Sequence, residues 1–252
     1  MQLYVAVTPQ ETTLRFRCET AYAAYRIGEG STLLRQNPLP KENGGLLLIS
    51  DVRAPAVPSP DALCEAVLRE CTRRKANGAV LDFESAPRKD LLDFASALQQ
   101  ALVPKSLALF VPEGYASAAA QAGVIVGTAL SGGNLREHLH HASKRYGNRL
   151  ALDVERVRMD FPLPCRSGKG TPLTGIELKE LMERISPSVF FSPDLCARYF
   201  TYRGETGPRF VLFDDAETIK RKLQLGRELG ASAAFLMWPE VQDIAEGLGL
   251  LR

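Results

Sequence analysis

Two acidic residues near the end of the segment 77–84, which reads Asn-Gly-Ala-Val-Leu-Asp-Phe-Glu, have the spacing that acid–base chemistry needs. Side chains alternate along a strand, so Asp82 and Glu84 point to the same side, with backbone positions roughly 7 Å apart. Carboxyl groups this close can share a proton, which raises the pKa of one of them. A carboxylic acid kept protonated near neutral pH can act as a general acid. The pair is therefore a candidate catalytic site.

A second pair with the same spacing, Asp153 and Glu155, follows another short apolar run. By the same alternation these two acids share one face. Two interpretations fit them: contacts to a polar ligand, or a polar rim around the site, and the rim is the simpler one. For Asp82 and Glu84 the alternative to a site is a polar strand end held in salt bridges.

The elements that would carry these acids alternate along the chain from residue 45 onward. Apolar runs predict buried strands at residues 46–50, 79–84, 107–112, 124–128, 150–154, 189–192, 210–213 and 233–238. Helical patterns with capping residues cover 61–75, 134–146 and 215–229. Strands that alternate with helices indicate a parallel sheet. We therefore predict an α/β fold, a (β/α)8 TIM-type barrel, as a single domain over 1–252 with the acids at its mouth.

The first 44 residues follow another pattern. Short strands at 3–7, 13–18 and 21–27 are joined by turns, and no helical periodicity is present. We expect this atypical β-rich part, 1–44, to replace the first βα units as a β-meander. The segment 162–175, rich in proline and glycine, is predicted to be a long loop over the active face.

Composition narrows the partners. The net charge is +2, from 31 basic and 29 acidic side chains, which gives no electrostatic footprint for nucleic acid. The five cysteines are widely spaced without a C-x-x-C pair, so we expect no disulfide framework, no metal and no cofactor. No apolar run is long enough for a membrane span, and the N-terminus lacks a signal-peptide pattern. These features predict a cytoplasmic protein, and they give no signal for an oligomeric state.

The strand that carries Asp82 and Glu84 resembles the motif Asp-Gly-x-Asp-x-Asp-x-Glu of glycoside hydrolase family 18. The resemblance implies that Glu84 is the general acid/base and that Asp82 orients the N-acetyl group of the substrate. In that family the N-acetyl group itself attacks the anomeric carbon, so no protein nucleophile is needed. The implied reaction is retaining hydrolysis of an N-acetylglucosamine glycan such as peptidoglycan or chitin.

The resemblance continues over roughly residues 45–245. The segment 210–219 resembles the seventh helix unit of the spore-germination, cortex-lytic branch, and 233–238 resembles the last strand. In the family the tryptophan of that strand forms the floor of a sugar subsite, which implies a substrate-binding role for Trp238. Tyr202 lies in the strand-like stretch that leads into the helix unit and is a second candidate for substrate binding.

The sequence also departs from the family motif. Asn77 and Val80 stand where the family has its first two aspartates, and residues 127–131 lack the Tyr and Asp of its sixth strand. Losing such supports weakens transition-state stabilisation. The resemblance therefore implies a degenerate site of low activity, unless Tyr115 or Tyr202 supplies a replacement donor.

Three functions remain open at this stage. The chain is a glycosidase of low activity, a barrel that binds a glycan or a protein partner without cleaving it, or a structural protein in which the barrel merely persists. The sequence does not decide whether it is an enzyme.

Overall fold

The computed structural model describes residues 1–11, 14–36, 44–165 and 168–252. Within these residues, eight parallel strands close into a ring in the order β1-β2-β4-β5-β6-β7-β8-β14, because β1 pairs with both β14 and β2. The ring strands are β1 Gln2–Val7, β2 Glu19–Gly28, β4 Leu46–Ser50, β5 Gly78–Asp82, β6 Ala108–Pro112, β7 Gly123–Gly127, β8 Leu150–Asp153 and β14 Ala233–Met237. The predicted (β/α)8 barrel is confirmed.

Two apolar clusters hold this barrel together, one on each side of the ring. Alternate strand residues such as Leu48, Val80 and Phe235 fill the interior. Their neighbours along the strands, such as Leu47 and Leu81, pack outward in the larger cluster with the helices. The period-two alternation therefore fixes which residues of each strand reach the mouth of the barrel.

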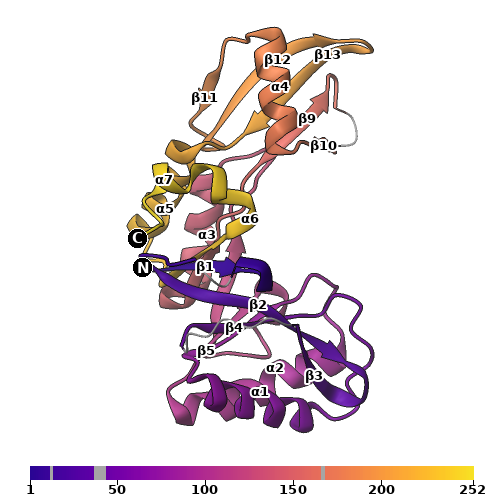
Figure 1. Ribbon diagram of the computed structural model, residues 1–252, viewed down its shortest axis with the longest axis vertical. Helices are drawn as coiled ribbons and strands as arrows, with labels where there is room; N and C mark the ends of the chain where they lie inside the picture. Colours follow the sequence, from indigo (N-terminus) through magenta and orange to yellow (C-terminus); the bar gives the residue numbers. More distant parts are fainter. Residues whose placement is uncertain (12–13, 37–43, 166–167) are drawn as a thin grey trace.

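The predicted helices form, with their caps. The ring is covered by α1 Pro60–Arg74, α2 Lys89–Leu102, α3 Leu135–Tyr146 and α5 Ala216–Glu228, followed by the short α6 Trp238–Val241 and α7 Ala245–Leu248 (Figure 1). Asn134 Oδ1 accepts the N–H of Glu137 at 3.1 Å, and Asp215 Oδ1 accepts that of Thr218 at 2.8 Å. These side chains satisfy donors that a helix start leaves without partners. None of the helices in the described residues is long and apolar enough to cross a membrane.

A second, antiparallel sheet lies between β8 and β14 in the sequence and stands at one end of the molecule (Figure 1). Its strands are β9 Arg158–Pro162, β10 Thr171–Pro172, β11 Phe190–Ser192, β12 Ala197–Gly204 and β13 Gly207–Phe213, and α4 Gly175–Ile185 packs on it. Assigning the strands predicted at 189–192 and 210–213 to the parallel sheet was therefore wrong. An apolar run shows that a strand is buried, whereas its pairing partner is decided elsewhere in the chain.

The N-terminal part is β-rich, as expected, and its described residues contain no α-helix before β4. The predicted meander is wrong, because β1 and β2 pair in parallel as ring strands. Only β3 Thr32–Arg35 forms a hairpin with β2. Of the strand predicted at 13–18, residue 13 lies outside the described residues, and the rest contributes one bridge, from Phe16 to Leu251.

Candidate active site

The four predicted acids meet at the mouth of the barrel. Asp82 ends β5 and Asp153 ends β8, and Glu84 and Glu155 follow two residues later. All four line one cavity of about 290 Å³ over the carboxyl ends of the ring strands. Asp82 and Asp153 are half-buried, whereas Glu84 and Glu155 are exposed. In a barrel of this type, side chains in this position are the ones that contact substrate.

The wall between the acids is small and apolar. Val80, one pleat below Asp82, belongs to the barrel interior and has no polar atom in its side chain. Gly127 ends β7 and pairs with Asp153 in the strand register. A Cβ added at Gly127 would meet no heavy atom within 4 Å, so the cavity is open at this point. The structure thus places Gly127, with no side chain, beside the acids.

Burial and mutual repulsion raise the pKa values of the two half-buried acids. The pKa of Asp82 rises to about 6, first through burial and then through the charges of Glu84 and Asp51. The pKa of Asp153 rises to about 7 through burial, then through Glu155, Asp82 and Glu240. Acids whose charged form is disfavoured in this way are available for proton transfer near neutral pH.

Among the described residues, basic side chains do not relieve this repulsion by direct pairing. In the part of the chain that the structure describes, neither Asp82 nor Asp153 forms an ion pair with a lysine or arginine. The same residues contain no group of three or more His, Cys, Asp or Glu side chains placed to hold a metal ion. Carboxyl groups with raised pKa values, as at Asp82 and Asp153, can move protons to and from a ligand.

Asp51, which the sequence reasoning missed, positions the segment that carries Glu84. It is buried just after β4, and its Oδ1 accepts the backbone N–H of Glu84 at 2.9 Å. Its Oδ2 accepts the N–H of Ser85 at 3.2 Å and also the Ser85 hydroxyl. The signal was available, because Asp51 follows the apolar run 46–50 and acids after barrel strands point to the mouth.

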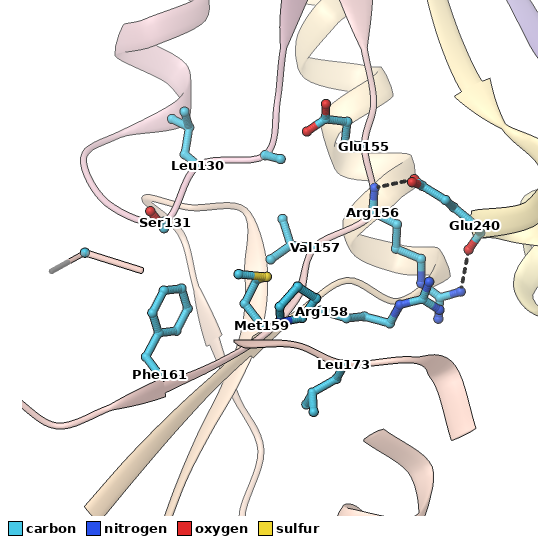
Figure 2. A pocket seen from close by; sticks show the side chains of 13 residues that line it. Leu130, Ser131, Glu155, Arg156, Val157, Arg158, Met159, Phe161, Leu173 and Glu240 are labelled. Atoms are coloured by element: carbon cyan, nitrogen blue, oxygen red, sulfur yellow. Dashed lines mark hydrogen bonds between the residues drawn. The ribbon is translucent and has the colours of Figure 1, made fainter. Parts of the chain in front are cut away.

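A second pocket of about 410 Å³ adjoins the acid cavity, and Glu155 lines both. Figure 2 shows Leu130, Met159 and Phe161 lining this pocket, so it runs between the barrel mouth and the antiparallel sheet. The Arg156 N–H donates to Glu240 Oε2 at 3.2 Å at its edge. A ligand in the acid cavity can therefore extend into a groove lined by both apolar and charged side chains.

The segment predicted as a loop over the active face contributes to this groove. Residues 166–167 lie outside the described residues, and the short strand β10 interrupts the rest. Gly168, Pro172 and Leu173 line the pocket beside the acids.

Trp238 is not brought to the acids. Its side chain is 5% exposed and packs in the outer core, with its ring edge-on to Phe16 at a centroid distance of 4.9 Å. Along β14, Phe235 and Met237 belong to the barrel interior and Leu236 to the outer core, and Trp238, one residue after Met237, also packs in the outer core. Trp238 was expected to form the floor of a sugar subsite. In this arrangement its side chain offers no free face to a ligand.

Tyr202 and Tyr115 are also placed elsewhere. Tyr202 lies on β12 of the antiparallel sheet, where its hydroxyl donates to Asp160 Oδ2 at 2.8 Å. Arg209 Nε donates to the same carboxylate at 2.9 Å. Tyr115 is buried against Phe83. Among the described residues that line the acid cavity and the adjoining groove, neither tyrosine is found.

Comparison with known proteins shows the same fold. No family model and no curated protein matches the sequence. Among solved structures, a chitinase from Chromobacterium violaceum is similar at 15% identity and a TM-score of 0.69, with 97% of this chain and 98% of that chain covered. The spore cortex-lytic enzyme SleL from Bacillus megaterium gives 15% identity and a TM-score of 0.67, with 96% and 73% covered.

A class V chitinase from Nicotiana tobaccum, a mutant in complex with NAG4, gives 12% identity and a TM-score of 0.69, with 98% of each chain covered. These likenesses confirm at the level of the fold the resemblance inferred from the sequence. The chain thus shares its barrel fold with proteins that include a chitinase and spore cortex-lytic enzymes.

Proposed function

We propose that this chain hydrolyses an N-acetylglucosamine-containing glycan, with Glu84 as general acid/base and Asp82 as the residue that orients the substrate. The observation that carries the proposal is that both carboxyl groups line one open cavity at the mouth of a closed barrel. Structural neighbours that are chitinases, one in complex with NAG4, and a cortex-lytic enzyme support chitin-type or peptidoglycan-type glycans as the substrate class.

The proposed reaction has two steps. Glu84 donates its proton to the glycosidic oxygen while the bond from that oxygen to the anomeric carbon breaks. The carbonyl oxygen of the substrate's acetamido group forms the new bond to that carbon, and Asp82 accepts the acetamido N–H. Water then attacks the same carbon while the bond from that carbon to the acetamido oxygen breaks, and the water gives a proton to Glu84, which restores the acid and retains the configuration.

The test is Glu84→Gln, which keeps the shape of the side chain and removes its acid function. We expect kcat/KM for a chitobiose-type chromogenic substrate to fall by about a hundredfold or more, while oligosaccharide binding persists. Glu180→Gln, on the exposed face of α4, is the matched control and should leave turnover unchanged. Equal turnover by wild type and Glu84→Gln would remove the catalytic role.

A second function, glycan binding without cleavage, is favoured by Val80, Ala129 and Leu130. Val80 lies in the barrel interior below Asp82, and Ala129 and Leu130 line the adjoining groove, whereas the motifs of glycoside hydrolase family 18 have polar residues at the matching positions. Calorimetry with N-acetylglucosamine oligomers and with peptidoglycan fragments separates the two functions. Binding with no released product favours the binding function, and no binding of any oligomer would exclude both.

A further inference from the structure

Two acids of the cavity, Asp153 and Glu155, have no role in the proposed reaction. On β5, Asp82 has Val80 one pleat below it, and a valine cannot share a proton. Strand β5 has no second acid below Asp82 that could hold a proton while Asp82 is charged. If Asp82 is to accept a substrate N–H, another group nearby must take the proton that the cluster keeps.

The end of β8 supplies such a group. Asp153 pairs with Gly127 of β7 on one side and with Phe235 of β14 on the other. Because Gly127 has no side chain and leaves open space, no side chain at the end of β7 separates Asp153 from the cavity that Asp82 also lines. Residues of two ring strands that are far apart in the sequence thus share one small volume.

The charges around the two aspartates support a link between Asp153 and Asp82. The groups that act on Asp153 and its neighbours come from several elements, and most are acidic. The acidic ones are Glu155 beside it, Asp82 at the end of β5, Glu84 two residues later, Asp51 after β4 and Glu240 of α6. The basic one is Lys222 of α5, which acts on Glu155. Several carboxylates in one cavity cannot all be ionised. Of the two half-buried acids that line the cavity, Asp153 has the higher pKa and therefore holds the proton better than Asp82.

We propose that Asp153 is a positioning residue that retains a proton in place of the acid missing at Val80, so that Asp82 can be anionic when it meets the substrate. This role rests on the proposed function, because Asp153 acts through Asp82. It predicts a pH window in which Asp82 is ionised and Asp153 is still neutral. Given pKa values of about 6 and about 7, that window lies between these two values.

The first experiment needs no turnover. The midpoint of the Asp153 carboxyl titration is followed by NMR in the wild type and in Asp82→Asn, with the signal assigned by its loss in Asp153→Asn. Removing the Asp82 charge should lower the Asp153 midpoint by about one pH unit. Glu180→Gln should not move it. Asp82→Ser serves if Asp82→Asn does not fold, and an unchanged midpoint overturns the proposal.

The second experiment uses the pH profile of kcat/KM on the same chromogenic substrate. Asp153→Asn is neutral at every pH, so its profile should retain activity to a pH at least about one unit higher than that of the wild type. A merely structural role would lower the whole profile without moving its alkaline limb, and that result overturns the proposal. A wild type without turnover contradicts the hydrolase function only, and the NMR titration then decides the role of Asp153.

Discussion

Two aspartates with opposite surroundings show how this fold separates structure from chemistry. Asp214, just after β13, is fully buried, and its carboxylate accepts from Lys222 Nζ at 2.6 Å, the Val157 N–H at 2.9 Å and the Thr218 hydroxyl at 2.8 Å. Asp153, at the end of β8, has acids rather than cations as neighbours. A buried acid with a full set of donors holds the fold together, whereas one without them remains available for proton transfer.

The structural acid also supports the candidate site. Besides accepting the Val157 N–H, Asp214 donates its own N–H to the Val157 carbonyl at 2.8 Å. Both bonds hold the segment that leads from Glu155 into the antiparallel sheet. Asp214 therefore holds in place the backbone next to Glu155, which is one of the four acids of the candidate site.

The largest expected effect comes from removing the cation that pairs with Asp214. Lys222→Met leaves the Asp214 charge buried without its cation, which should lower the free energy of unfolding by about 3–5 kcal/mol in urea denaturation. Lys220→Met, on the exposed face of the same helix, removes only a surface pair with Glu217 and should cost less than about 1 kcal/mol. Similar losses in the two variants would contradict the distinction.

Replacing Asp153, by contrast, should raise the free energy of unfolding. Because the folded protein raises the pKa of Asp153 from 3.8 to about 7, it keeps a proton that the unfolded chain has lost. The stability from this group is fully present below about pH 4 and is lost as pH rises through about 7. Asp153→Asn should therefore stabilise the protein at pH 8 by about 2 kcal/mol, raising Tm by roughly 4–8 °C.

Asp90 is a matched control for the direction of this change in stability. Its carboxylate accepts the Val57 N–H at 2.8 Å and pairs with Arg88, and these contacts hold its pKa below the usual value despite partial burial. Asp90→Asn should lower Tm at pH 8, whereas Asp153→Asn raises it. If calorimetry showed Asp153→Asn to be destabilising at pH 8, the picture of an unrelieved acid cluster would be wrong.

The smallest effect is expected at Tyr202, whose placement removes it from the site. Tyr202→Phe deletes one hydrogen bond to Asp160, which keeps its ion pair with Arg209. We expect a loss of about 1 kcal/mol of stability and unchanged affinity for N-acetylglucosamine oligomers in calorimetry. A variant of normal stability that binds these oligomers more weakly would return Tyr202 to the ligand contacts.

The sequence alone determined the features that depend on near neighbours in the chain. Alternation along the segment 77–84 placed Asp82 and Glu84 on one face, and the repeated strand–helix pattern indicated the barrel. Caps such as Asn134 and Asp215 marked helix starts that the structure confirms. These are local effects, because a side chain and a backbone group two or three residues away decide them.

Only the tertiary structure decided the features that depend on distant partners. Trp238 turned outward because the register of β14 gave the inward positions to Phe235 and Met237. Strand β13 joined an antiparallel sheet because it pairs with β9 and β12 rather than with the ring. The depth of Asp153, and with it the raised pKa, arises where β8 closes against β7 and β14. Pairing and burial are properties of the assembled ring, and no short stretch of sequence contains them.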